Sequence, residues 1–300
     1  MQQQRKALTQ PPDHRILHGG PKVKIRPRIS TIVVLGVILF WLPPLSGVRA
    51  DTLEIPGTGA CEVLLQAVAQ AFNARHPQQR VLVPPSIGTV GGMRLISSDK
   101  AVLVRVARPL TKEEKNLGLS YLPFARDMVI FAVGAKVPVR NITTSRLVEV
   151  YSGKIKNWGA LGGPNAPIRL LLRQPGDSSL LIIQKHLKAF RTITFDPSGK
   201  IPYTDPEMLA LLQKYNYAIG WLTFSALKDA KTPIYPLALD GIAPNPENAL
   251  TKKYNLLEEY ALVFKENRLD NLSRIFMDFL FSPAGKKVIE SMGTIPLPRK

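Results

Sequence analysis

The chain has 300 residues, 45% of them hydrophobic, and a formal net charge of +18. This length permits two domains of ordinary size, and this apolar content is enough for packed cores. The first 50 residues hold eight of the 40 Lys and Arg and one of the 22 Asp and Glu, which leaves +11 for the rest. A basic body suits an anionic ligand or surface. Because no nucleic-acid motif and no basic run interleaved with aromatic residues accompanies the charge, we predict no nucleic-acid partner.

The N-terminus has the pattern of an export signal. Residues 1–28 are polar and basic, residues 29–42 are apolar, and Val48-Arg49-Ala50 matches a small-residue cleavage site. The pattern predicts a signal peptide over 1–50 and a periplasmic mature protein. An uncleaved membrane anchor is the alternative, but the apolar stretch is shorter than the roughly 20 residues that a spanning helix needs. Positive charge before that stretch predicts export of the body in either case.

Cysteine and histidine are scarce. Cys61 is the single cysteine, so the chain forms no internal disulfide. Its place at the start of an apolar helix predicts a buried packing residue. Only His76 and His186 follow residue 50. Without a Cys and His cluster, we predict neither a metal site nor a cofactor.

Strands and helices alternate along the first part of the mature chain. Expected strands are 52–55, 80–83 and 102–106, and expected helices are 61–72 and one that starts at 93. Glycine loops at Gly57–Ala60 and Gly88–Gly92 separate them. The alternation predicts a parallel, doubly wound α/β domain, in which ligands bind beyond the carboxyl ends of the strands.

The second part continues the pattern. Expected strands are 127–133, 217–222 and 259–264, and expected helices are 147–151, 272–280 and one that begins near Ser282. The long apolar strands 127–133 and 259–264 are candidate crossovers between two lobes. The loop 152–158 ends in Trp158, which we expect in the core.

The segment around Arg173 carries the clearest chemical signal. An apolar strand, 168–172, leads into it, and an apolar helix follows. Asp177 or Ser178 can cap that helix, whose first turn leaves backbone N–H groups unpaired and slightly positive. Two hydroxyls, from Ser178 and Ser179, and one arginine at such a point predict a site for a small oxyanion. The alternative is a capped corner with a surface arginine.

Several motifs occur in a recognisable order. They are Gly88–Gly92, Ala107-Arg108-Pro109-Leu110, Tyr151-Ser152-Gly153-Lys154-Ile155-Lys156-Asn157-Trp158, Gly162-Gly163-Pro164, Arg173–Ser179, Ala218-Ile219-Gly220-Trp221 and Phe281-Ser282-Pro283-Ala284-Gly285. From about Leu53 to Leu297 the chain resembles the phosphate-binding proteins of bacterial ABC importers, which have the type II periplasmic binding fold. The resemblance implies two doubly wound α/β lobes joined by crossover strands. Lobe I would comprise 51–127 and 255–300, and lobe II would comprise 128–254.

The resemblance also implies a function. The protein would be an exported, monomeric substrate-binding protein that captures phosphate or a similar oxyanion between its lobes. It would deliver the ion to the permease subunits of an ABC importer and catalyse nothing. The implied ligand-binding residues are Thr58, Gly59, Thr89, Arg108, Arg173, Asp177, Ser178 and Ser179. Arg108 has an alternative role, in which it pairs with a carboxylate.

Three positions depart from the family pattern. Ala60 and Ala107 stand where the family has hydroxyls, and Asp177 replaces a serine. These changes leave open a binding protein of the same fold that takes another ligand as a sensor or adaptor. A remote alternative is a GDSL-like hydrolase with Ser178 as nucleophile, which would need a histidine base. His186 lies eight residues further along the same expected helix, so we predict that the protein is not an enzyme.

Overall fold

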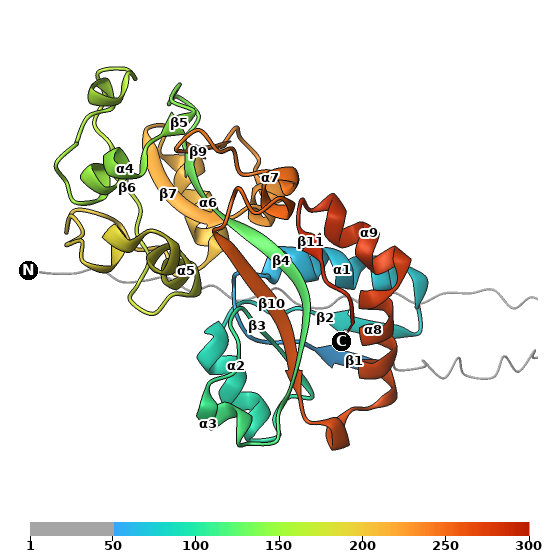
Figure 1. The fold of residues 1–300 in the computed structure, drawn as a ribbon. Coiled ribbons are helices and arrows are strands. Elements are labelled where there is room, and N and C mark those ends of the chain that lie inside the picture. Colours follow the sequence, from blue (N-terminus) through green and yellow to red (C-terminus); the bar gives the residue numbers. More distant parts are fainter. Residues whose placement is uncertain (1–50, 300) are drawn as a thin grey trace, which may run out of the picture. The chain divides into compact units, whose positions relative to one another are not determined.

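The computed structural model describes residues 51–299 (Figure 1), so the expected signal peptide lies outside the described residues. The strands are β1 (Asp51–Glu54), β2 (Gln79–Leu82), β3 (Leu103–Val106), β4 (Ser120–Val133), β5 (Asn141–Ile142), β6 (Arg169–Leu170), β7 (Ala218–Thr223), β8 (Tyr235–Pro236), β9 (Ala238–Leu239), β10 (Leu257–Phe264) and β11 (Ile295–Pro296). The α-helices are α1 (Glu62–Arg75), α2 (Gly88–Ser97), α3 (Lys112–Lys115), α4 (Thr144–Tyr151), α5 (Ser178–His186), α6 (Asp205–Lys214), α7 (Pro246–Leu250), α8 (Asn271–Phe281) and α9 (Pro283–Ser291).

Two long strands run through the described part of the molecule. The main sheet has the order β3-β10-β4-β7-β6, and β4 and β10 are its central neighbours (Figure 1). Both are antiparallel to every strand that they pair with. The expectation of parallel strands is correct for β1 with β2 and for β6 with β7, but the sheet as a whole is mixed. The sheet is mixed because β4 and β10, the two expected crossover strands, run in opposite directions and are each antiparallel to the strands beside them.

The hydrophobic core falls into clusters on either side of this crossover. One cluster is built from buried residues between 128 and 256, and it includes the expected core residue Trp158. Two others are built from residues 53–125 and 260–289, and Cys61 lies fully buried among them, as predicted. Burial raises the pKa of the Cys61 thiol to about 12, so it is an inert packing group. The lobe limits at 127–128 and 254–255 stay a prediction.

One helix begins earlier than its glycines suggest. The segment Gly88–Gly92, expected as a loop before a helix at 93, forms the first turn and a half of α2. Gly88 enters the helix with φ of +72°, a conformation that suits glycine, and its N–H donates to Ser86 Oγ at 3.1 Å. The expected glycine loop is therefore a helix N-terminus.

Among residues 51–299, no helix combines the length and the apolar composition that crossing a bilayer requires.

Candidate anion site

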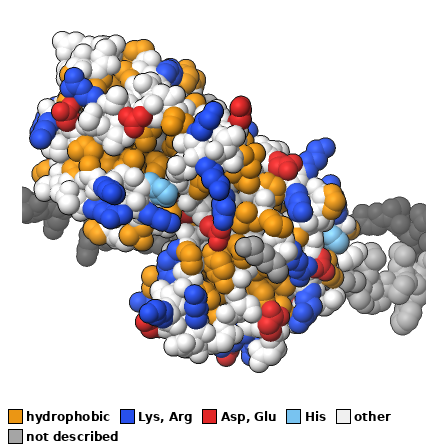
Figure 2. Space-filling view, viewed as in Figure 1, with side chains coloured by type: hydrophobic (Ala, Val, Ile, Leu, Met, Phe, Trp, Pro, Cys, Tyr) orange, Lys and Arg blue, Asp and Glu red, His pale blue; other side chains and the backbone are white. Residues whose placement is uncertain are grey.

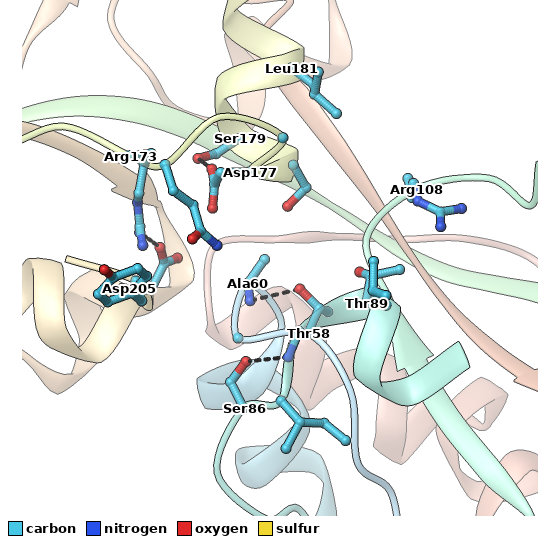
Figure 3. Close-up of a pocket in the computed structure, with 18 residues that line it drawn as sticks. Thr58, Ala60, Ser86, Thr89, Arg108, Arg173, Asp177, Ser179, Leu181 and Asp205 are labelled. Atoms are coloured by element: carbon cyan, nitrogen blue, oxygen red, sulfur yellow. Dashed lines mark hydrogen bonds and ion pairs between the residues drawn. The ribbon is translucent and has the colours of Figure 1, made fainter. Parts of the chain in front are cut away.

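All eight residues that the sequence assigned to ligand binding line one cavity of about 280 Å³ (Figure 3). Thr58, Gly59, Thr89 and Arg108 belong to the segment assigned above to lobe I. Arg173, Asp177, Ser178 and Ser179 belong to the segment assigned to lobe II. Their convergence places them around a common volume; their contacts with an ion stay a prediction.

Three helix N-termini that carry candidate ligand residues meet at this cavity, and the first residue of a fourth helix, Asp205 of α6, lines it as well. Gly59 and Ala60 precede α1, Thr89 lies in the first turn of α2, and Ser178 and Ser179 begin α5; all of these line the cavity. The N–H groups of a helix's first turn have no partner within the helix and carry partial positive charge. These N–H groups favour an anion in the cavity, while the carboxyl groups of Asp177 and Asp205, which also line it, oppose one.

A buried arginine that the sequence reasoning missed shapes the lobe I wall. Arg105 on β3 is fully buried, and its Nε donates to the Thr58 carbonyl at 2.7 Å. Its Nη2 donates to the Pro84 carbonyl at 2.8 Å and reaches Glu62 Oε2 at 3.3 Å. Arg105 thus fixes the loop that carries Thr58 and Gly59. The sequence did hold a signal for this role, because Arg105 stands inside an apolar strand. A charged residue is buried in such a strand only when it has partners.

The same loop requires glycine at position 57. Gly57 has φ of +144°, and a Cβ there would collide with the Arg105 backbone carbonyl. The close approach allows Thr58 N–H to donate to the Arg105 carbonyl at 3.1 Å. Backbone packing of this kind is available only to a residue without a side chain.

Arg173 is buried beside a carboxylate that the sequence reasoning also missed. Its Nη2 forms an ion pair with Asp205, the first residue of α6, and both side chains are at most 5% exposed. Asp205 Oδ2 also accepts from the backbone N–H of Thr223 at 2.9 Å and from its hydroxyl at 2.6 Å. Burial raises the pKa of Asp205, while Arg173 opposes that shift. Arg173 Nε is buried and has no hydrogen-bond partner among the described residues, so one strong donor at this wall is unsatisfied.

Asp177 caps α5, which was one of the two alternatives for its role. Its Oδ1 accepts from the Leu180 N–H at 3.1 Å and from the Ser179 hydroxyl. The Ser179 hydroxyl in turn accepts from Trp221 Nε1 at 3.1 Å, so this hydroxyl is committed to protein partners. Ser179 can therefore offer an ion its backbone N–H but not its hydroxyl. The half-buried Asp177 also lines the cavity (Figure 3), so its cap and its contact with the cavity coexist.

Arg108 takes the alternative role foreseen for it while still lining the cavity. Its two terminal nitrogens donate to Glu114 at 2.7 and 2.8 Å, and Nη1 also donates to the Pro109 carbonyl at 2.9 Å. The bond to Glu114 raises the pKa of Arg108, and the same bond lowers the pKa of Glu114. Arg108 is the more exposed of the two cavity arginines, because its side chain is 28% exposed against 2% for Arg173.

The departures from the family pattern fall in different places. Ala60 lies on the cavity wall without a hydroxyl to offer. Ala107 is buried and does not line this cavity. Ser86, which the sequence reasoning did not select, does line it, and its hydroxyl bonds the Gly57 carbonyl at 3.3 Å.

The arrangement does not support hydrolysis through Ser178. Ser178 and His186 are the first and last residues of α5, so they are separated by about 12 Å along the helix axis. That separation is far beyond the roughly 3 Å at which a base takes a proton from a nucleophile. Within residues 51–299, no group of three or more His, Cys, Asp or Glu residues could hold a metal ion.

Comparisons with known proteins agree with this geometry. The family model described as "PBP superfamily domain" matches residues 44–284. The phosphate-binding protein PstS of Bacillus subtilis is 26% identical over 256 residues, covering 83% of this chain and 81% of that protein. The phosphate-binding protein PstS of Borreliella burgdorferi is 24% identical over 247 residues, covering 80% and 88%.

Solved structures show the same architecture. A candidate phosphate ABC transporter substrate-binding protein from Clostridium perfringens, with bound phosphate, superposes with a TM-score of 0.72 at 26% identity and covers 82% of this chain and all of that one. An ABC-type phosphate transport receptor from Vibrio cholerae, at 22% identity and a TM-score of 0.59, shares the fold over 83% of this chain and all of that one. Because the family model covers well over half of the sequence, the chain belongs to the PBP superfamily.

Proposed function

We propose that this protein is an exported substrate-binding protein that captures phosphate, or a similar tetrahedral oxyanion, and presents it to an ABC importer. The observation that carries the proposal is the convergence of three helix N-termini and Arg173 on one cavity. A volume of about 280 Å³ lies below the roughly 300–1,000 Å³ that drug-sized ligands occupy, so the site suits a small ion. The names of the curated relatives, which are phosphate-binding proteins, point to phosphate within that class.

The surface beside the cavity suits an anionic ligand as well. Lys and Arg side chains gather on the face that carries α5 (Figure 2). A neighbouring cavity is lined by four cations, Arg108, Arg126, Lys185 and Lys252, and by one carboxylate, Glu259, which pairs with Arg126. A cleft with an excess of one sign of charge raises the local concentration of counter-ions and speeds their association. We infer that this face guides the ion to the site. Binding alone accounts for these features, so the proposal includes no catalytic step. The protein would act as a monomer and pass the ion to the permease subunits of the importer.

Capture between lobes predicts closure. The crossover strands β4 and β10 would act as the hinge, with Thr58 and Thr89 on one lobe and Arg173 and Ser178 on the other. We expect small-angle X-ray scattering to show a smaller radius of gyration in saturating phosphate than in phosphate-free buffer. Sodium chloride at matched ionic strength is the control. An unchanged radius in saturating phosphate would rule out the hinge mechanism.

Export predicts the mass of the mature chain. Cleavage after Ala50 would yield a protein that begins at Asp51. Intact-mass analysis of protein from the periplasmic fraction should give residues 51–300. A membrane-bound product that retains residues 1–50 would instead identify the uncleaved anchor.

The alternative of a retuned sensor or adaptor rests on Ala60, which removes a hydroxyl from the cavity wall. It predicts that another small anion binds more tightly than phosphate. Competition among phosphate, sulfate, molybdate and arsenate for the same site distinguishes the two.

A further inference from the structure

Two acidic side chains face each other on the crossover strands. Asp127 on β4 and Glu258 on β10 occupy directly opposite positions in the antiparallel ladder. Opposite residues project to the same face of a sheet, with their Cβ atoms about 5 Å apart. Both side chains are 0% exposed. Two carboxyls this close and this dry cannot both be ionised without a large electrostatic penalty.

The surroundings of Glu258 favour its neutral, protonated acid. Neither of its carboxyl oxygens has a hydrogen-bond partner among the described residues. An ionised carboxylate buried without donors is strongly disfavoured, and the neutral acid is the state that such a site accepts. Burial raises the pKa of Glu258 well above its ordinary value. The Ser178 hydroxyl opposes this shift, and the charges of Asp177, Asp205 and Asp127 add to it.

Asp127 accepts more hydrogen bonds than Glu258, and these bonds stabilise its ionised form. It accepts from the backbone N–H of Met128 at 2.7 Å, from the backbone N–H of Ser225 at 3.2 Å and from the hydroxyl of Tyr260 at 3.3 Å. Burial raises its pKa to about 7, with the hydrogen bonds from Ser225 and Met128 opposing the shift and the charge of Asp205 adding to it. The ionised and protonated forms of Asp127 are therefore close in free energy near neutral pH.

The pair lies directly behind the anion cavity. Helix α5 packs on β10, and its N-cap, Asp177, and its first residue, Ser178, line the cavity. On the other side, the Tyr260 hydroxyl reaches both Asp127 and the backbone carbonyl of Ala60, at 3.0 Å from the latter, and Ala60 is part of the cavity wall. When Asp127 is protonated, its O–H can donate to the Tyr260 oxygen while the Tyr260 O–H donates to Ala60. Protonation thus completes a chain of hydrogen bonds that ends at Ala60, in the loop that carries Thr58 and Gly59.

The charged groups around the pair decide how an anion in the cavity affects the protonation of Asp127. The groups around the pair are Asp177 on the α5 cap, Asp205 on α6 and the Tyr260 hydroxyl, with Arg173 as the nearby cation already paired to Asp205. Cys61, the N-cap of α1, is neutral, and Arg105 on β3 is paired with Glu62. An added anion therefore raises the free energy of an ionised Asp127 more than that of the neutral acid.

We propose that Asp127 and Glu258 form a proton-binding site that is coupled to the anion site, so that anion capture takes up a proton near neutral pH. This inference rests on the proposed function, since it requires an anion in the cavity. By linkage, an anion that favours the protonated site must itself bind more tightly when the site is protonated. Affinity should therefore rise as pH falls through 7, by at most about tenfold per pH unit, the limit for a single proton.

Calorimetry at pH 7 in buffers of different ionisation enthalpy measures the protons taken up when inorganic phosphate binds. We expect the unmutated protein to take up more protons than Asp127→Asn, by up to one per phosphate bound. The comparison removes the proton exchange of phosphate itself, which both proteins share. Asp278→Asn, which removes an equal charge from an exposed side chain on α8, is the matched control and should behave as the unmutated protein.

The outcomes separate the two proposals. If phosphate binds but the proton count is the same with and without Asp127, the proton site is refuted and the proposed function stands. If phosphate does not bind to the unmutated protein, the proposed function itself fails. Infrared difference spectroscopy tests the site even if Asp127→Asn does not fold, because it uses the unmutated protein. At pH 7 that protein should show a protonated-carboxyl band, and the band should grow when phosphate is added. The absence of any such band would contradict a protonated Glu258.

Discussion

Arg173→Ala is expected to weaken phosphate binding by roughly 10- to 100-fold or more. Arg173 is the more buried of the two cavity arginines, and its Nε is a donor without a partner in the described structure. A charge-assisted hydrogen bond contributes about 1.5–3 kcal/mol, and about 1.4 kcal/mol corresponds to tenfold in affinity. Calorimetric titration of both proteins with phosphate measures the loss. Arg108→Ala, which removes the same charge from a side chain already bound to Glu114, is the matched comparison and should lose less.

The same substitution should also destabilise the fold, because it leaves Asp205 buried without its cation. Breaking a buried ion pair by removing one partner costs about 3–5 kcal/mol. Since burial raises the pKa of Asp205 and Arg173 opposes the shift, losing Arg173 raises that pKa further. The loss in free energy of unfolding should therefore be largest at high pH. It should shrink as pH falls, because Asp205 then takes a proton and no longer needs a cation.

A double variant separates stability from binding. Arg173→Met combined with Asp205→Asn removes both charges and should recover much of the free energy of unfolding while phosphate binding stays weak. If the double variant binds phosphate as tightly as the unmutated protein, or if Arg108→Ala is the more damaging of the two alanine variants, Arg173 is not the principal anion ligand.

Phosphate is expected to bind at least about tenfold more tightly than sulfate, and Asp177→Asn should narrow that preference. Asp177 uses Oδ1 for the α5 cap and lines the cavity as well. A carboxylate is an acceptor only, so it can take a hydrogen bond from phosphate, which still carries a proton near neutral pH, and it repels fully ionised sulfate. The amide of asparagine keeps the capping oxygen and removes the charge. Titrating both proteins with both anions gives the two ratios.

Stability distinguishes a change at the ligand from a change at the cap. Asparagine caps a helix about as well as aspartate, so Asp177→Asn should leave the free energy of unfolding nearly unchanged. Asp177→Ala removes the cap and should lower it by about 1 kcal/mol. If Asp177→Asn preserves the ratio of phosphate to sulfate affinity, the side chain serves the helix alone.

Local rules predicted the parts of the site that depend on neighbours in sequence. The turn before α5, its cap at Asp177 and the hydroxyls of its first turn follow from residue types at fixed offsets. The burial of Cys61 and Trp158 follows from their place in apolar segments. The start of α2 was missed because glycines are typical of loops. A glycine with positive φ can also stand at the first position of a helix, as Gly88 does here.

The groups that sequence reasoning missed depend on contacts between distant segments. Asp205 lies 32 residues from Arg173, and at the start of α6 it resembles an ordinary first-turn acid. Arg105 acts on a loop 47 residues away, at Thr58. Glu258 carried a weak signal, since the alternation along β10 places it on the buried face with Tyr260. Periodicity could place that carboxyl inside, but only the pairing of β4 with β10 shows that it faces Asp127.

The most direct test of the anion site is a calorimetric titration of the unmutated, exported protein with inorganic phosphate near neutral pH. The site described here predicts saturable binding of one phosphate per chain, with sulfate a weaker competitor for the same site. The absence of saturable binding for any tetrahedral oxyanion, or sulfate bound as tightly as phosphate, would contradict it.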